Sequence, residues 1–133
     1  MFNKILCVDD DPITLMLCKK VIIKSQFSKE IDLANNGEKA LHYFDNLIAK
    51  ILNVEYVISP ELVFLDLNMP IMNGWEFLNT FSKPQYNNYF STVRIIILSS
   101  TIDPKDVEKS KQFPIVTHFL SKPITQEMLY DLK

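Results

Sequence analysis

Residues 62–66 read Leu-Val-Phe-Leu-Asp, a short apolar run that ends in a carboxylate. Four consecutive apolar residues are typical of a strand buried on both faces of a parallel sheet. A carboxylate at the end of such a strand is costly to place there unless it has a partner or a function. Asp66 is therefore the residue on which the interpretation of the chain depends.

The same arrangement recurs at three other places in the chain. Each is an apolar run followed by polar residues suited to phosphoryl chemistry: Ile5-Leu6-Cys7-Val8 before Asp9-Asp10-Asp11, Ile95-Ile96-Ile97-Leu98 before Ser99, and Val116 with Phe119-Leu120 before Ser121-Lys122-Pro123. Ligands of open α/β sheets bind beyond the carboxyl ends of the strands. We therefore expect carboxylates, a hydroxyl and an ammonium to meet in one pocket, which could bind a divalent cation and a phosphoryl group.

Helical patterns alternate with these strands. Strands are expected at residues 4–8, 31–34, 62–65, 94–98 and 116–120, and helices from Pro12, over 40–51, 75–81 and 104–112, and from Thr125. The first helix is predicted to bury a stripe of Ile13, Leu17 and Val21, and residues 85–92 are expected to form a polar and aromatic loop. The pattern predicts a (βα)5 fold, a doubly wound five-stranded parallel sheet of the flavodoxin-like type, as one domain over residues 1–133.

Composition excludes several classes of protein. The net charge is −2 and no basic cluster is present, so nothing predicts nucleic-acid binding. No apolar run reaches membrane-spanning length and no room is left for a signal peptide before the first strand, so we expect a cytoplasmic protein without membrane partners. Cys7 and Cys18 lie in very different places in the sequence and are expected to be buried free thiols rather than a disulfide. His42 and His118 have no ligand-spaced partners, which favours surface or structural roles.

Asp9, Asp10 and Asp66 form the predicted acidic cluster. Carboxylates held close together repel, and Mg²⁺ relieves that repulsion with oxygen ligands while keeping several waters. The alternative is that residues 9–11 only cap the first helix, for which Asp11 is the natural residue. If residues 9–11 only cap the helix, the position of Asp66 at the end of a buried strand is left unexplained.

Lys122 and Ser99 complete the predicted pocket. The ammonium of Lys122 could pair with a phosphoryl oxygen or with Asp66, and a cis bond to Pro123 could aim it into the pocket. The alternative is a surface lysine before a helix-starting proline. Ser99 could donate a hydrogen bond to a phosphoryl oxygen, or be an ordinary residue at the end of a strand. It is their shared location at strand ends that favours the functional interpretation.

Four segments resemble the signatures of response-regulator receiver domains. They are Val8-Asp9-Asp10, Phe64-Leu65-Asp66-Leu67-Asn68-Met69-Pro70-Ile71-Met72-Asn73-Gly74, Ile97-Leu98-Ser99-Ser100 and Phe119-Leu120-Ser121-Lys122-Pro123. The resemblance covers almost the whole chain. It implies a phosphorelay signalling domain rather than an enzyme with its own substrate, in which a sensor histidine kinase or a histidine phosphotransfer protein phosphorylates Asp66.

The resemblance also implies roles for the other residues. Mg²⁺ would be held at Asp66, by Asp9, Asp10 and the backbone carbonyl of Asn68. Ser99 and Lys122 would bind the phosphoryl oxygens. Phe119 would change rotamer together with Ser99 and alter a face that binds an unknown downstream protein; the alternative for Phe119 is a plain core aromatic. Serine stands at 99 where threonine is commoner in the family.

Two other functions remain open from the sequence. Asp9-x-Asp11 after a strand also resembles haloacid-dehalogenase-type phosphatases, with Asp9 as nucleophile and Asp11 as general acid. That mechanism needs an acidic pair after the lysine, where the chain offers only Glu127 and Asp131. The third possibility is an inactive receiver-like scaffold, against which the intact acids, Ser99 and Lys122 argue.

Overall fold

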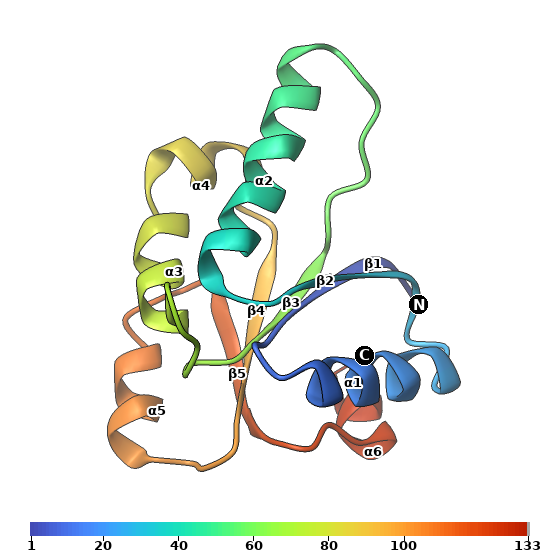
Figure 1. The fold of residues 1–133 in the computed structure, drawn as a ribbon, viewed down its shortest axis with the longest axis vertical. Helices are drawn as coiled ribbons and strands as arrows, with labels where there is room; N and C mark the ends of the chain where they lie inside the picture. The colour runs from blue at the N-terminus through green and yellow to red at the C-terminus, as the bar shows by residue number, and fades with distance from the viewer. Residues whose placement is uncertain (133) are drawn as a thin grey trace.

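The computed structural model describes residues 1–132, in which five parallel strands form one sheet (Figure 1). The strands are β1 (Phe2–Val8), β2 (Ser28–Ala34), β3 (Leu62–Leu65), β4 (Arg94–Ser99) and β5 (Val116–Ser121). Their order is β2-β1-β3-β4-β5. The chain therefore reverses its winding direction between β1 and β3, and this switch point is where open α/β sheets place their ligand sites.

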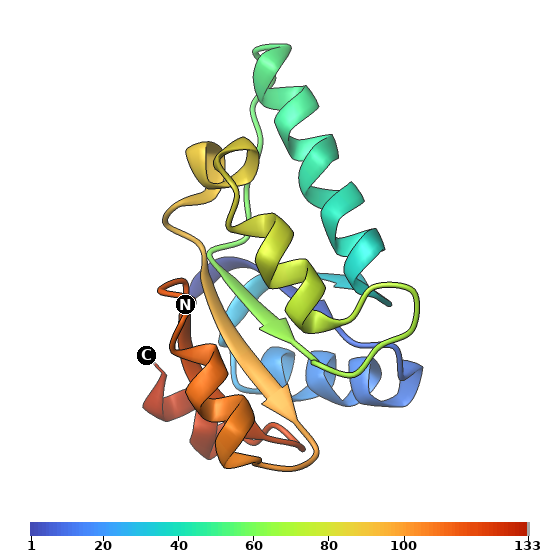
Figure 2. The same ribbon diagram turned by 90° about the vertical axis from the view of Figure 1, so that its left-hand side faces the viewer.

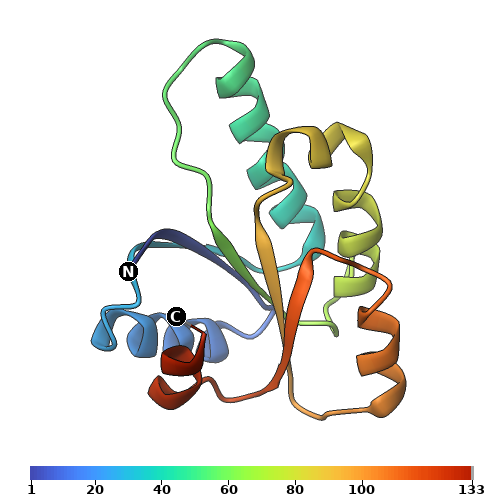
Figure 3. The ribbon, with the colours of Figure 1, turned by 180° about the vertical axis from the view of Figure 1, so that it is seen from behind.

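Six helices cover both faces of the sheet. They are α1 (Pro12–Lys24), α2 (Gly37–Leu52), α3 (Gly74–Phe81), α4 (Pro84–Phe90), α5 (Pro104–Ser110) and α6 (Gln126–Asp131). Figure 2 shows α2, α3 and α4 on one side of the strands, and Figure 3 shows α1 and α6 together on the other. The predicted doubly wound parallel sheet is thus confirmed, and β1, β2, β4 and β5 are longer than expected. No helix in residues 1–132 is long and apolar enough to cross a membrane.

Alternate residues of the central strands pack into two separate hydrophobic cores, one on each face of the sheet. In β3, Val63 and Leu65 face the core formed with α2, α3 and α4, whereas Leu62 and Phe64 face the core formed with α1 and α6. Successive side chains of a strand point to opposite faces, so a continuous apolar run is what a doubly covered strand requires. With both faces closed, polar chemistry is confined to the ends of the strands.

The predicted buried face of α1 is wrong. Leu15, Cys18 and Ile22 are buried, while Ile13 and Leu17 are 63% and 47% exposed. The helix starts at Pro12 and is capped by Asp11, as expected. Apolar residues occupy most positions of this helix, so periodicity alone could not identify the inner face; the direction in which the helix crosses the sheet decides it.

The predicted loop at residues 85–92 is also wrong, because α4 occupies most of it. Pro84 stands in the first turn of the helix, and Tyr86 and Phe90, one turn apart, are both buried. The ring of Phe90 lies 4.8 Å from that of Phe44 on α2. The hydroxyl of Tyr86 donates a hydrogen bond of 2.7 Å to Asp45. Only two of seven residues contact the core, too weak a pattern to recognise without the neighbouring helix.

Cys7 and Cys18 are buried free thiols, as expected, but they are not far apart in space. Cys7 lies on β1 and Cys18 on the face of α1 that covers it, and both side chains line the same small cavity. The neighbouring Cys18 thiol, together with burial, raises the pKa of the Cys7 thiol well above its ordinary value.

The hydrogen bond between Tyr86 and Asp45 should stabilise the packing of α4 against the middle of α2. We expect Tyr86→Phe to lower the free energy of unfolding by about 1 kcal/mol, since it removes a hydrogen bond to a carboxylate and preserves the ring. Tyr89→Phe, on the exposed side of the same helix, is the matched control and should change stability by less than about 0.5 kcal/mol. Urea denaturation measures both, and equal effects would show that the hydroxyl of Tyr86 adds nothing.

Candidate functional site

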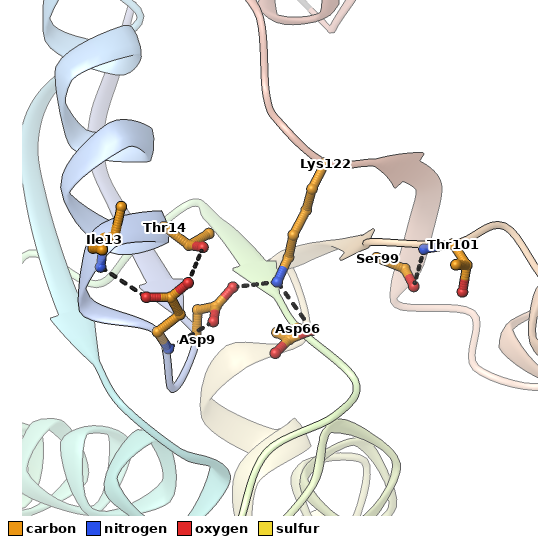
Figure 4. A network of polar contacts seen from close by, with 8 residues as sticks. Asp9, Ile13, Thr14, Asp66, Ser99, Thr101 and Lys122 are labelled. Carbon is orange, nitrogen blue, oxygen red and sulfur yellow. Dashed lines mark hydrogen bonds and ion pairs between the residues drawn. The ribbon is translucent and has the colours of Figure 1, made fainter.

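Four strand ends place polar side chains at one edge of the sheet (Figure 4). Asp9 directly follows β1, Asp66 follows β3, Ser99 is the last residue of β4, and Lys122 follows β5. Because β1, β3, β4 and β5 are consecutive in a parallel sheet, their carboxyl ends share one edge. The prediction that these side chains come from a single edge therefore agrees with the topology.

The structure brings the three predicted acids together. Carboxylate oxygens of Asp9, Asp10 and Asp66 all lie within 4.8 Å of one another. Asp9 and Asp66 are buried, and Asp10 is exposed. Magnesium binds oxygen at about 2.1 Å in octahedral geometry, so ligands on opposite sides of the ion lie about 4.2 Å apart. The spacing of the three acids is compatible with such an ion that keeps several waters.

The ammonium of Lys122 lies between two of these acids. Its Nζ donates to Asp9 Oδ2 at 2.5 Å and lies 3.3 Å from Asp66 Oδ1. The Lys122-Pro123 bond is cis. Burial lowers the pKa of Lys122, but the hydrogen bond to Asp9 and the charges of Asp66 and Asp9 outweigh burial and raise it overall. Lys122 therefore stays charged, and it pairs with Asp9 more closely than with the expected Asp66.

The surroundings of Asp66 disfavour its charged form. Burial raises its pKa, and the negative charge of Asp9 raises it further. The charge and hydrogen bond of Lys122 and the backbone N–H of Asn68 lower it, without cancelling the increase. Three carboxylates share one ammonium, so with all four groups ionised an excess of two negative charges remains. One divalent cation would balance that excess.

Asp11 is a capping residue and not part of the acidic cluster. Its carboxylate accepts hydrogen bonds from the Ile13 N–H and the Thr14 hydroxyl, both at 3.0 Å, and these bonds lower its pKa. The backbone N–H of Asp11 donates to Asp9 Oδ1. The capping alternative is thus correct for Asp11, while Asp9 is held with one oxygen toward this turn and the other toward Lys122.

Ser99 lies at the same edge, but its hydroxyl is not bonded to the acids. Its Oγ accepts a hydrogen bond of 3.3 Å from the backbone N–H of Thr101 (Figure 4). Its carbonyl accepts one of 2.8 Å from the backbone N–H of Lys122. The second bond ties the two strand ends together. Thr101 was not singled out from the sequence, since a backbone donor gives no signal in residue type.

Phe119 and Trp75 are both half-buried at the border of the hydrophobic core. Phe119 is half-buried against the core of α2 and α3 rather than inside it. The ring of Trp75 stacks on Phe113 at 6.2 Å, with the ammonium of Lys109 4.6 Å from its centroid. The indole therefore joins α3 to α5 and the segment before β5.

Gly74 explains the tight loop that follows Asp66. Its N–H donates to the carbonyl of Leu67, and a Cβ on Gly74 would lie only 2.5 Å from the main-chain oxygen of Asp66. Asn73 caps α3 through a capping box with Glu76. The absence of a side chain at 74 is what lets α3 begin directly against the end of β3, which fixes the backbone next to Asp66.

The phosphatase alternative finds little support in this geometry. Its general acid would be Asp11, which is engaged as a helix cap. Glu127 and Asp131, the acids after Lys122, are exposed on α6 and do not join the cluster found in the described part of the chain.

Comparisons with known proteins point in one direction. The model of the response regulator receiver domain matches residues 5–132. The nitrate/nitrite response regulator protein NarL of Escherichia coli is 29% identical over 103 residues, which cover 77% of this chain and 40% of that protein. Hybrid signal transduction histidine kinase L of Dictyostelium discoideum is 27% identical over 133 residues, covering 99% of this chain and 7% of that protein. The chain therefore spans less than half the length of either relative.

Solved structures give the same picture. The crystal structure of a two-component response regulator from Cytophaga hutchinsonii superimposes with a TM-score of 0.85 at 28% identity, covering 98% of this chain and 93% of that one.

The raised pKa of Asp66 predicts that the stability of the fold depends on pH. A carboxyl whose pKa is higher in the folded than in the unfolded protein destabilises the fold as pH rises past its ordinary pKa of 3.8. We expect Asp66→Asn to raise the free energy of unfolding at pH 7 by about 1 kcal/mol, with the advantage over wild type disappearing below that pKa.

Denaturation at several pH values measures this difference. Asp131→Asn, an exposed acid on α6, is the control and should stay close to wild type at every pH. A less stable Asp66→Asn at pH 7 would mean that pairing with Lys122 outweighs burial and repulsion.

Proposed function

The chain belongs to the response regulator receiver domain family, and we propose that it accepts a phosphoryl group on Asp66 from a phosphohistidine. The observation that carries this proposal is the position of Asp66, a buried carboxylate beside Asp9 and 3.3 Å from the ammonium of Lys122. The donor would be a sensor histidine kinase or a histidine phosphotransfer protein. In the transfer, an Asp66 carboxylate oxygen forms the new bond to phosphorus as the bond to the histidine nitrogen breaks.

Magnesium would be held by Asp9, Asp10, Asp66 and the backbone carbonyl of Asn68. The compact spacing of the three acids and their excess negative charge support this assignment. When bound, the ion would supply positive charge to the phosphoryl oxygens. Asp9, buried and oriented by Asp11 and Lys122, would keep its place through the transfer. Exposed Asp10 is the ligand nearest to solvent.

Lys122 and Ser99 would stabilise the phosphorylated state. A phosphoryl group brings about two negative charges and three acceptor oxygens. Lys122 already lies beside Asp66 and needs only to exchange part of its pairing with Asp9 for a phosphoryl oxygen. Ser99 would have to turn its hydroxyl away from the Thr101 N–H. The hydrogen bond that it would lose is weak, because its length of 3.3 Å is near the long end of the usual range.

The signal would leave through the face of α5, β5 and α6. Helix α5 buries only Ser110, and α6 buries only Leu129 within its bounds, whereas α2 buries five residues. Elements with few buried contacts are the least costly to rearrange. The carbonyl of Ser99 accepts a hydrogen bond from the backbone N–H of Lys122, so a movement of Ser99 would reach β5, where Phe119 is only half-buried. A downstream protein would recognise the altered face.

Phosphorylation should occur on Asp66. We expect acetyl phosphate with Mg²⁺ to add one phosphoryl group to the wild-type protein and none to Asp66→Asn, because no other carboxylate in the cluster lies at the end of the central strand. Intact mass and mapping of the phosphorylated peptide measure this. Labelling should require Mg²⁺ and fall at least about tenfold in Asp10→Ala.

Two further variants separate the alternatives. Labelling that survives in Asp66→Asn but disappears in Asp9→Asn would favour the phosphatase mechanism. Labelling of Asp10→Ala at the wild-type rate would remove Asp10 from the metal ligands. No labelling of any protein, with the fold intact, would favour the inactive scaffold.

Phosphorylation should also change amide exchange far from Asp66. We expect beryllofluoride to alter hydrogen–deuterium exchange in residues 103–112 and 119–132, because these segments carry few buried contacts. The interior of α1 should change little, since three of its residues are buried. Asp66→Asn with beryllofluoride is the control. Changes limited to the loops around Asp66 would contradict the switch and indicate a phosphoryl shuttle instead.

A further inference from the structure

Two buried cysteines lie next to the acidic cluster. Cys7 on β1 and Cys18 on α1 are 2% and 5% exposed. Both line one small cavity of about 10 Å³ whose walls also include Asp9 and Asp66, so the two side chains are neighbours. They are the only cysteines in the chain. No ligand or catalytic role in the proposed phosphoryl transfer uses either sulfur.

Cys18 also has a route toward the surface. It lines a second cavity of about 60 Å³ with Leu17, Lys122 and Pro123, between α1 and the turn after β5. Leu17 is 47% exposed, so this cavity lies next to the protein surface. A volume of roughly 10–15 Å³ is enough to hold one water molecule. A small peroxide can therefore reach Cys18 without unfolding of the helix.

We propose that Cys7 and Cys18 are a redox modification site, at which hydrogen peroxide forms a reversible disulfide that joins β1 to α1. The sulfur of Cys18 attacks one peroxide oxygen, the O–O bond breaks, and Cys18 becomes a sulfenic acid as water leaves. The sulfur of Cys7 then attacks that of Cys18, the S–O bond breaks, and a second water leaves. The two thiols together lose two electrons and two protons, and one peroxide is reduced to two waters.

The bond would act on the neighbouring site. The two sulfurs are not bonded in the reduced protein and must approach to about 2.05 Å in a disulfide, so α1 and β1 are drawn together. The closed ring contains Asp9, Asp10 and Asp11, the turn that holds two of the proposed metal ligands and caps α1. An effect of the disulfide on phosphorylation rests on the proposed function. Since a displacement of about 1 Å near a reacting centre can cost up to about 100-fold in rate, we expect phosphorylation to slow by about tenfold.

The first measurement concerns the bond alone. Reduced wild-type protein is treated with hydrogen peroxide in native buffer and then alkylated. We expect an intact monomer that has lost two hydrogens, takes up no alkylating agent and regains both thiols with dithiothreitol. Both cysteines lie on one tryptic peptide, residues 5–19, because no lysine or arginine separates them. Cleavage before aspartate instead gives two peptides joined only by the disulfide.

The second measurement concerns the effect on the site. Labelling of Asp66 by acetyl phosphate is timed before oxidation, after oxidation and after reduction. Cys18→Ser and Cys7→Ser are the matched controls; each keeps one thiol, and their labelling rates should not respond to peroxide. Circular dichroism verifies that both variants fold, and Cys18→Ala replaces Cys18→Ser if the buried hydroxyl prevents folding.

Each result has one consequence. Thiols that remain open to alkylation, oxygen adducts without a disulfide, or only intermolecular dimers would overturn the proposal. An internal disulfide that leaves the labelling rate unchanged would overturn its link to the acidic site. Reduced wild-type protein that is never labelled would be a failure of the proposed function, and the mass measurement would still decide whether the disulfide forms.

Discussion

The pairing of one ammonium with two buried carboxylates is the interaction on which the site depends. Lys122 comes from the end of the last strand, and Asp9 and Asp66 come from the ends of the two strands at the switch point. Two buried like charges repel, and removing the shared cation would leave them uncompensated in a poorly solvated place. The ion pair therefore joins strands that are far apart in sequence, and it leaves an excess of negative charge that a divalent cation would balance.

The two hydrophobic cores that cover the faces of the sheet differ in size and composition. The core under α2, α3 and α4 contains a cluster of aromatic rings, among them Phe44 and Phe81 at 4.5 Å, and α4 adds the hydrogen bond of Tyr86 to α2. The opposite core is smaller, and it contains the two thiols. Helices α5 and α6 each bury a single residue within their bounds. Asp66 thus sits beside a well-packed face, while the helices that follow Ser99 and Lys122 have the fewest buried residues.

Whether the sequence predicts a structural feature depends on how far apart in the chain the interacting residues lie. The strand positions followed from continuous apolar runs, and the start of α1 followed from Asp11 and Pro12, because both signals are local. The buried face of α1 and the existence of α4 did not follow. In each case the deciding contacts, with the sheet for Leu15 and with Phe44 for Phe90, come from parts of the chain distant in sequence.

The sequence by itself determined the five parallel strands, the helices between them other than α4, and the residue types at the strand ends, since apolar runs, helical periodicity and a capping residue act over a few positions. Only the tertiary structure decided how those ends relate. Lys122 pairs more closely with Asp9 than with Asp66, the Ser99 hydroxyl is bonded to Thr101, and Cys7 lies against Cys18. These relations depend on strand order, register and the crossing of α1 over the sheet, which arise from packing between segments as much as 113 residues apart.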